Sequence, residues 1–361
     1  MKIIQIIPSF CTGGAEIMCE NLCRELKNAG HQVIPVSMYS KKTAISSRLE
    51  KEGFDVRYLG KKRGFRPSMI FKISKLLKQE NPDVLHAHTG AAQYAFLATI
   101  FHKIKAKVYT VHSLANYELN KVSRLLNKIA FKRLNVTPVA LSKIIKDSVT
   151  RLYKLKDQDV PIVFNGINLD DCLVKTDYSI NGNFKILHIG KFREEKNHEG
   201  LIDAFKKFSQ VHPDSQLDLI GDGVRLEQIK EYVSKQGLTD SVNFLLQQDD
   251  VYPILEKADI FALSSNYEGM PLTLIEAMGT AVPIVATRVG GIPDMLTDNF
   301  NAFLVDVNSQ ALCDAFCKYY DSEDLRSHFG KRAKERSEDF SATLMAKRYV
   351  EIYQEKIEGK R

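Results

Sequence analysis

Two glutamates stand eight positions apart in a segment that carries the signals of a helix start. Glu268 precedes Gly269 and Pro271, and Glu276 lies in the run of helix formers that follows. Proline suits the first helical position, and the first N–H groups of a helix lack intrahelical acceptors, so they can hold phosphate oxygens. The N–H groups placed to do so belong to Met270, Leu272 and Thr273. A carboxylate beside them can accept hydrogen bonds from vicinal sugar or ribose hydroxyls.

Each glutamate also has an equally good structural explanation when it is taken alone. A carboxylate at Glu268 is favourable near the positive end of a helix. Glu276 is then an ordinary surface residue on a segment of good helix formers. A binding role for this pair therefore depends on other groups that converge on the same place.

A second candidate segment, residues 190–197, follows an expected strand and precedes an expected helix. It contains the cations Lys191, Arg193 and Lys196. Three cations at the carboxyl end of a strand would suit a diphosphate. A solvated loop in which lysines pair with Glu194 and Glu195 is the equally good alternative.

A third candidate is the pair Gly13 and Gly14, which opens a helix after the first apolar run. Adjacent glycines let the backbone approach a ligand closely, and a helix N-terminus favours an anion. A plain tight turn explains the pair as well. The third glycine of the dinucleotide fingerprint is absent, which argues against a nicotinamide-dependent oxidoreductase.

Short apolar runs alternate with segments of helical period along most of the chain, which predicts βαβ units and parallel sheets. Two such sets predict an α/β protein of two doubly wound, Rossmann-like domains. We expect a first domain at 1–170, a linker at 171–183 and a second domain at 184–339. An amphipathic helix at 340–361 should cross back to the first domain. Ligands of such sheets bind at the carboxyl ends of the strands, so a crevice between the domains is the expected site.

Charge is distributed unevenly over the 361 residues. Residues 1–180 hold 29 basic and 15 acidic side chains, and residues 181–361 hold 22 and 29. The stretch from Lys61 to Lys78 holds seven basic residues, no acidic one and interleaved apolar residues. This pattern favours peripheral binding to an anionic membrane surface, although a helix with a solvated face explains it as well. Without a recognition motif or an aromatic platform, no nucleic-acid partner is expected.

Neither a metal nor a membrane span is expected. No run of 18 apolar residues occurs, and the N-terminus lacks the length and cleavage site of a signal peptide, so we expect a cytoplasmic protein. Asp157 and Asp159 match a D-x-D metal motif but precede a strand instead of following one. His86 and His88 share one face of a strand without a third ligand nearby, so packing is the better interpretation.

Together these segments resemble glycosyltransferase family 4. The resemblance rests on Glu268 and Glu276 in Glu-Gly-Met-Pro-Leu…Glu-Ala-Met, on the Gly13–Gly14 loop and on the loop 190–197. Supporting stretches are 83–88, 165–168, 219–223 and 289–293. The resemblance covers nearly the whole chain and is most specific in its second half. It implies a two-domain GT-B enzyme that transfers a sugar from a nucleotide-diphosphate donor, most simply a UDP-sugar, with retention of configuration and without a metal or other cofactor.

The resemblance also implies roles for individual residues. Glu268 would contact hydroxyls of the donor sugar, Glu276 would hold the ribose, and Lys191 and Lys196 would neutralise the departing diphosphate. His112, at the end of an expected strand, matches the family histidine near the donor sugar. The catalytic candidates are therefore Glu268, His112 and Lys196. The donor-binding candidates are Gly13, Gly14, Lys191, Arg193, Lys196, Gly269, Met270, Pro271, Leu272 and Glu276.

The chain departs from the family pattern at three places. Lys191 replaces a common arginine, Leu246 replaces the glycine of a Phe-x-Gly motif, and Gly279-Thr280-Ala281 replaces a small residue followed by glycine. The expected function is transfer to a glycan or lipid-linked acceptor in bacterial exopolysaccharide, capsule or lipopolysaccharide synthesis. The alternative is a non-catalytic sugar-nucleotide-binding or scaffold subunit of a polysaccharide assembly complex.

Overall fold

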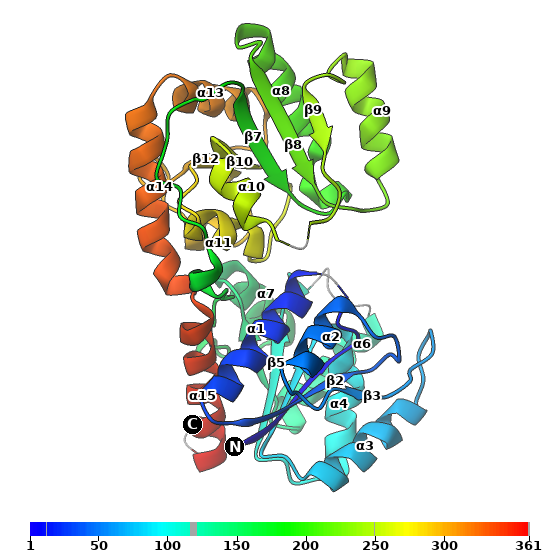
Figure 1. The fold of residues 1–361 in the computed structure, drawn as a ribbon. Helices are drawn as coiled ribbons and strands as arrows, with labels where there is room; N and C mark the ends of the chain where they lie inside the picture. Colours follow the sequence, from blue (N-terminus) through cyan, green and yellow to red (C-terminus); the bar gives the residue numbers. More distant parts are fainter. Residues whose placement is uncertain (12, 116–120, 249, 360–361) are drawn as a thin grey trace. The chain divides into compact units, whose positions relative to one another are not determined.

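The computed structural model describes all residues except 12, 116–120, 249 and 360–361 (Figure 1). The chain forms two compact units. The first comprises Met1–Ile167 together with Ala342–Arg361, and the second comprises Asn168–Ser341. Each unit is an α/β structure built on one sheet.

The sheet of the first unit has six strands in the order β3-β2-β1-β4-β5-β6, and every pairing is parallel. The strands are β1 (Lys2–Ile7), β2 (Gln32–Ser37), β3 (Arg57–Tyr58), β4 (Val84–His88), β5 (Ala106–Val111) and β6 (Thr137–Ala140). Strands β1, β4 and β5 lie at the centre and are almost wholly buried, as near-continuous apolar runs predict for a parallel sheet.

Helices connect these strands and cover the sheet. They are α1 (Gly14–Asn28), α2 (Ala44–Lys51), α3 (Ser68–Glu80), α4 (Ala92–Ala98), α6 (Lys121–Arg133) and α7 (Lys143–Tyr153). The C-terminal helix α15 (Ala342–Glu358) also belongs to this unit, where it packs against α1 and β5. The return of the C-terminal helix therefore agrees with its amphipathic pattern, since Met345, Tyr349 and Tyr353 are all buried.

The second unit repeats the plan with six parallel strands in the order β12-β11-β10-β7-β8-β9. They are β7 (Phe184–Ile189), β8 (Ser215–Ile220), β9 (Val242–Phe244), β10 (Ile260–Leu263), β11 (Ile284–Thr287) and β12 (Phe303–Val305). The helices are α8 (His198–Val211), α9 (Leu226–Gln236), α10 (Tyr252–Lys257), α11 (Leu272–Gly279), α12 (Ile292–Met295), α13 (Ser309–Tyr320) and α14 (Glu323–Ser337). The predicted pair of doubly wound parallel sheets is confirmed.

The segment 171–183, for which we expected a linker, lies within the second unit. Lys175 is buried, and its main-chain N–H donates to the carbonyl of Thr280 at 2.8 Å. Tyr178 is also buried, and its hydroxyl donates to the carbonyl of Ala281 at 3.0 Å. This irregular, polar segment is therefore part of the second unit. Hydrogen bonds that sequence periodicity does not reveal hold it there.

Candidate functional site

A charged pair lies at the carboxyl end of the second unit's sheet. The Nζ of Lys196 lies 2.6 Å from Oε1 of Glu268, and the hydroxyl of Ser265 donates to the same oxygen at 2.6 Å. Both charged side chains are largely removed from solvent. Burying two charges costs hydration free energy, and only a well-fixed geometry lets their attraction offset that cost.

The loop after β10 holds Glu268 through its backbone. The carbonyl of Glu268 accepts from the N–H of Gly291 at 3.2 Å, and a Cβ at Gly290 would lie 1.7 Å from that carbonyl oxygen. Gly290 also has φ +56°, so only glycine suits this contact without strain. The hydroxyl of Thr287, at the end of β11, donates to the carbonyl of Ser265 at 2.6 Å. The Gly-Gly turn after β11 thus fixes the carboxylate.

Lys196 is held by the turn that starts α8. Asn197 adopts the left-handed conformation with φ +51°, and its side chain accepts from the N–H of Gly200. The hydroxyl of Ser264 contacts the carbonyls of Lys196 and Asn197, both at 3.1 Å. Lys196 and Glu268 are therefore brought together by two loops that are themselves bonded to each other.

The start of α11 offers further donors to an anion. Pro271 is the N-cap residue, so the helix begins at Leu272, one position after the first helical residue that the sequence suggested, a difference within ordinary variation of helix ends. The main-chain N–H groups of Leu272 and Thr273 have no acceptor among the described residues, and the buried hydroxyl of Thr273 also lacks a partner there. Gly269 and Met270 lie in the loop that leads into this helix start.

Glu276 lies in the second turn of α11 and is only partly exposed. Burial raises the pKa of its carboxyl to about 7. No ion pair or hydrogen bond to its carboxylate is found among the described residues. Among the described residues the charge of the Glu276 carboxylate is therefore uncompensated, as expected of a group that accepts hydroxyl donors from a ligand.

The remaining cations of the loop 190–197 behave differently from one another. Lys191 is partly buried, next to Gly190, whose N–H donates to the carbonyl of Ile220 at 2.9 Å. Arg193 is exposed, and its guanidinium lies 3.8 Å from Glu195. Lys196 joins the buried pair, whereas Arg193 pairs in the solvated manner of the alternative interpretation.

In the first unit, Gly13 and Gly14 form the start of α1. Gly13 is the N-cap, and the carbonyl of Gly13 accepts from Ile17 at 3.0 Å. A Cβ at Gly14 would meet nothing within 4 Å, so no packing within the unit demands glycine at this position. The space beside Gly14 is open to a ligand.

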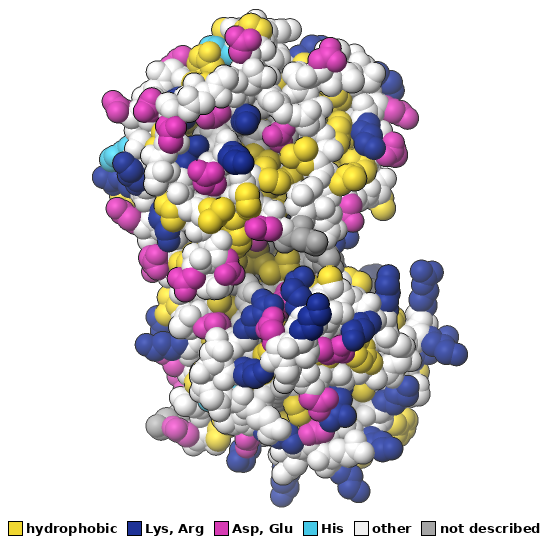
Figure 2. All heavy atoms as spheres, in the orientation of Figure 1, with side chains coloured by type: hydrophobic (Ala, Val, Ile, Leu, Met, Phe, Trp, Pro, Cys, Tyr) yellow, Lys and Arg dark blue, Asp and Glu magenta, His cyan; other side chains and the backbone are white. Residues whose placement is uncertain are grey.

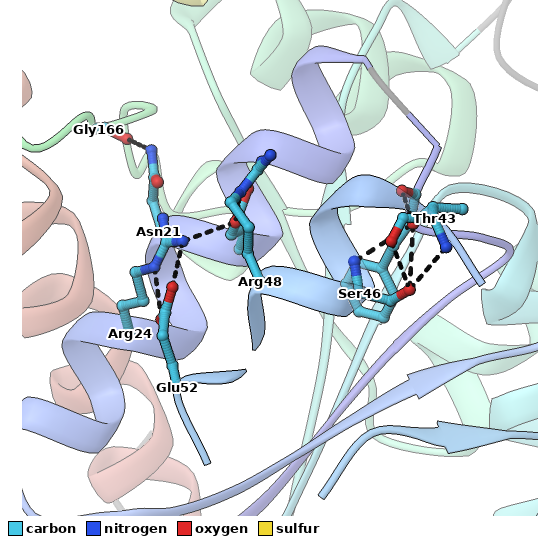
Figure 3. Close-up of polar contacts among 9 residues, drawn as sticks. Asn21, Arg24, Thr43, Ser46, Arg48, Glu52 and Gly166 are labelled. Atoms are coloured by element: carbon cyan, nitrogen blue, oxygen red, sulfur yellow. Dashed lines mark hydrogen bonds and ion pairs between the residues drawn. The ribbon is translucent and has the colours of Figure 1, made fainter. Parts of the chain in front are cut away.

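Polar contacts hold α1 in place from one side (Figure 3). Arg24 donates to both carboxylate oxygens of Glu52, at 2.8 and 2.6 Å, and Asn21 donates to the carbonyl of Gly166 at 3.1 Å. Arg48 of α2 donates to Glu20, which is almost fully buried. These contacts fix the direction of α1 and with it the position of the glycine pair.

His112 follows β5 directly, and its Nε2 lies 3.1 Å from Nδ1 of His88. Burial lowers the pKa of His112 to about 3, so the imidazole is neutral at physiological pH. His86 and His88 are fully buried and hydrogen-bonded to Tyr353 and Gln5 respectively. The packing interpretation of this histidine pair agrees with their surroundings.

Gln5 and Tyr353 were not identified from the sequence as hydrogen-bond partners of these histidines. Gln5 is one polar residue in an apolar strand, and Tyr353 is one buried position of an amphipathic helix. The only signal was a polar residue in the middle of a buried parallel strand, which requires a hydrogen-bond partner.

Within the part of the chain that the structure describes, no three His, Cys, Asp or Glu side chains lie close enough together to hold a metal ion. In the same part, no helix is both long and apolar enough to cross a membrane.

Two family models together match most of the chain. Residues 12–171 match the family model "Glycosyltransferase Family 4", and residues 175–336 match the model "Glycosyl transferases group 1". An N-acetyl-alpha-D-glucosaminyl L-malate synthase of Bacillus anthracis is 31% identical over 79% of this chain and 78% of its own length. A Campylobacter jejuni N-acetyl-D-galactosaminyltransferase that acts on an undecaprenol-linked glycan is 25% identical over 98% and 99%.

A crystal structure of HepE from Anabaena in complex with UDP and glucose superimposes with a TM-score of 0.85. It shares 18% sequence identity and covers 98% of this chain and 99% of its own. This likeness shows the fold. The two Rossmann-like units are those of the GT-B architecture that the sequence resemblance implied.

Proposed function

Since this chain belongs to glycosyltransferase family 4, we propose that it transfers a sugar from a nucleotide-diphosphate donor with retention of anomeric configuration and without a metal. The donor is a UDP-sugar, and the acceptor is a glycan or a lipid-linked glycan of a bacterial surface polysaccharide. The observation that carries this proposal is the buried cluster of Lys196, Glu268 and Ser265 beside the free amides at the start of α11.

The cluster suits a departing diphosphate. Lys196 has three N–H donors, of which one is held by Glu268, so two can reach phosphate oxygens. The amides of Leu272 and Thr273 add donors at the positive end of α11. These groups are fixed before the reaction, and they stabilise the negative charge most as the bond to the sugar breaks.

The second glutamate suits the ribose. Two vicinal hydroxyls can donate to the carboxylate of Glu276 and offset the loss of hydration that raises its pKa to about 7. Glu268 accepts two hydrogen bonds on one oxygen, and its other oxygen is available to hydroxyls of the donor sugar. From the family resemblance we also propose ligand contacts for His112, Gly13 and Gly14 of the first unit.

Retention can arise without a covalent intermediate. Glu268 is engaged with a lysine and a serine, which suits a hydrogen-bond acceptor better than a nucleophile. The acceptor hydroxyl then attacks the oxocarbenium-like sugar on the face from which the diphosphate leaves. Double displacement is the competing mechanism, and a glycosyl-enzyme trapped on Glu268 by mass spectrometry would establish it.

The donor assignment is tested by a thermal-shift panel of UDP, GDP, ADP and TDP on the wild type and on Glu276→Gln. A ligand at 100 times its Kd stabilises by about 2.7 kcal/mol. We expect a shift with UDP that Glu276→Gln abolishes. Glu231→Gln, which changes an exposed glutamate on α9, is the matched control and keeps the shift. A shift with another base alone would replace UDP by that base, and an unchanged shift in Glu276→Gln would remove the ribose role.

Catalysis is tested by donor hydrolysis and by transfer to polysaccharide intermediates. We expect turnover that does not change in the presence of a chelator and that Lys196→Ala reduces about a thousandfold. Nucleotide binding without hydrolysis or transfer would instead favour the non-catalytic or scaffold subunit.

On this proposal the first unit also meets an anionic membrane surface, where a lipid-linked acceptor is available. Dark blue side chains project from the lower part of the first unit in Figure 2, where Figure 1 places α3. Phe71, 74% exposed, shares an outward face of α3 with Lys75 and Lys78. Lys61 and Lys72 instead donate to main-chain carbonyls, so only part of the basic stretch is available to lipid.

Sedimentation with vesicles at low salt tests this surface. We expect binding to phosphatidylglycerol vesicles, none to phosphatidylcholine vesicles, and loss of binding in Lys75→Glu/Lys78→Glu. The double variant Lys230→Glu/Lys235→Glu makes the same charge change on α9, where Lys235 is exposed and Lys230 is partly exposed, and should still bind. Equal loss in both variants would show that net charge alone, and not α3, sets the binding.

A further inference from the structure

A row of buried hydrogen bonds leads from His112 into the core of the first unit. His112 Nε2 lies 3.1 Å from Nδ1 of His88, and Nε2 of His88 lies 2.9 Å from Oε1 of Gln5. The amide nitrogen of Gln5 donates to the hydroxyl of Tyr353 at 3.3 Å. Three of these four residues lie on strands β4 and β1 or directly after β5, whereas Tyr353 comes from α15.

The row continues beyond Tyr353. Its hydroxyl lies 2.7 Å from Nδ1 of His86, and Nε2 of His86 lies 2.7 Å from the hydroxyl of Thr110. The hydroxyl of Thr110 lies 2.7 Å from that of Tyr349. Apart from His112, which is partly exposed, every member of the row has a relative exposure of 0%.

The three imidazoles of the row are neutral. Burial lowers the pKa of His112 to about 3 and lowers the pKa values of His86 and His88 well below the usual range. A neutral imidazole carries one N–H and one lone pair. Each ring can therefore donate at one nitrogen only, and the direction of one bond decides the direction of the next.

The amide of Gln5 sets that direction, because its oxygen only accepts and its nitrogen only donates. Its oxygen faces His88, so Nε2 of His88 carries the hydrogen and Nδ1 carries the lone pair. His112 must then donate to that lone pair from its own Nε2. On the other side the amide nitrogen occupies the acceptor site of Tyr353, which donates to Nδ1 of His86.

We infer that Gln5, acting through His88 and held by Tyr353, fixes His112 in the tautomer that carries its hydrogen on Nε2. The Nδ1 of His112 then presents a lone pair, which accepts a hydrogen bond from a ligand hydroxyl. Gln5, His88 and Tyr353 are positioning residues, since they act on the reaction through His112. Only the role of a ligand at His112 rests on the proposed function; the tautomer does not.

The cost of this arrangement argues for a role beyond packing. Seven polar side chains, on the central strands or packed against them, stabilise the fold no more than apolar side chains of similar volume would, and every unmade hydrogen bond among them is penalised. The C-terminal helix contributes two tyrosine hydroxyls to the row. Helix α15, which follows the second unit in the sequence, thus completes the row of hydrogen bonds that ends at His112, directly after β5.

The tautomer is tested directly by NMR on ¹⁵N-histidine-labelled protein without any substrate, using two-bond correlations within the imidazole rings. Signals are assigned from His86→Asn, His88→Asn and His112→Asn. We expect the Nε2–H form at all three rings. If the Gln5 amide is reversed, the row reverses and all three rings become Nδ1–H, a result that overturns the inference.

The coupling is tested with Tyr353→Phe, which removes the acceptor of the Gln5 amide nitrogen. We expect His112 to become a mixture of tautomers and kcat to fall about tenfold or more, with the KM for the donor within twofold. The control Tyr319→Phe removes an equally buried hydroxyl, bonded to the carbonyl of Ile284 in the second unit, and should change neither.

An unchanged His112 tautomer in folded Tyr353→Phe would overturn the coupling. If Tyr353→Phe does not fold, the wild-type spectra still decide the tautomer. A wild type with the expected tautomer but without transferase activity would contradict the proposed function and leave the tautomer assignment standing.

Discussion

The two units place different chemistry on the same scaffold. Counted from its own first strand, each sheet has the order 3-2-1-4-5-6 with parallel pairing throughout. At the end of the fourth strand the first unit has the neutral His88, and the second has the loop that carries Ser265 and Glu268. In both units the topology places a side chain at the carboxyl end of the fourth strand. The residue types at that position decide what it can bind.

The difference shows how each unit compensates its buried polar groups. Behind His112 the first unit satisfies them with a continuous row of neutral donors and acceptors, although Asn127 and Ser142 elsewhere in this unit have buried polar atoms without a partner among the described residues. The second unit leaves compensation incomplete, because the amides of α11 and the carboxylate of Glu276 have no partner among the described residues. Incomplete compensation suits a site that an anionic, hydroxyl-rich ligand completes.

The largest expected effect comes from breaking the charged pair of the second unit. Lys196→Ala should lower transfer about a thousandfold and destabilise the fold by about 3 kcal/mol, since Glu268 loses its counter-charge. The double variant Lys196→Met/Glu268→Gln should regain stability in urea unfolding without regaining activity. Activity restored in the double variant would contradict a direct role for the pair.

The first unit should be the more sensitive to acid. His86, His88 and His112 have pKa values lowered by burial, so the unfolded chain binds protons that the folded chain does not. Stability is therefore lost as the pH falls below about 6.5, by up to about 1.4 kcal/mol per pH unit for each histidine. Thermal unfolding between pH 7.5 and 5 measures this loss, and a flat Tm would refute the neutral row.

His188 and His198 of the second unit also make the fold less stable in acid, because burial lowers their pKa values to about 4 and about 2. Fluorescence or exchange probes in each unit separate the two contributions. Equal acid sensitivity of the units would weaken the contrast between them.

Glu276 should respond to pH in the opposite sense. Its pKa is about 7 when folded against an ordinary 4.5, so the folded chain binds the extra proton and stability declines as the pH rises from about 4.5 to about 7. Glu276→Gln should therefore be more stable than the wild type by about 1–2 kcal/mol at pH 8 and no more stable at pH 4.5. Urea unfolding at the two pH values measures the difference. A variant less stable at pH 8 would indicate a compensating partner for the carboxylate.

The smallest effect concerns a residue at which the chain departs from its family. Leu246 has φ +49° and is 55% exposed, where the family pattern has glycine. Leu246→Gly removes the strain of a left-handed leucine but adds unfolded-state entropy, so we expect a gain of about 0.5 kcal/mol. Leu246→Ala keeps a Cβ and should show no gain. A gain of equal size in both would assign the effect to the side chain and not to the backbone.

Much of this molecule follows from its sequence, because periodicity and glycine placement are local signals. Apolar runs located the strands, and the motif around Glu268 located a loop that the structure holds tightly. The Lys196–Glu268 pair was not predicted, since its members are 72 residues apart and each had a separate role. The hydrogen bond between Gln5 and Tyr353 joins residues 348 positions apart, and no sequence pattern indicates such a pairing. The donor-binding role of Arg193 stays a prediction, because sequence does not reveal the direction of a long, exposed side chain.

The central claim is that the second unit carries the nucleotide site, and hydrogen–deuterium exchange with and without saturating UDP tests it most directly. We predict slower exchange at the first turn of α11 and in residues 190–197, with little change around the buried row of the first unit. Slower exchange confined to the first unit, or no change at a UDP concentration that stabilises the protein, would contradict the claim.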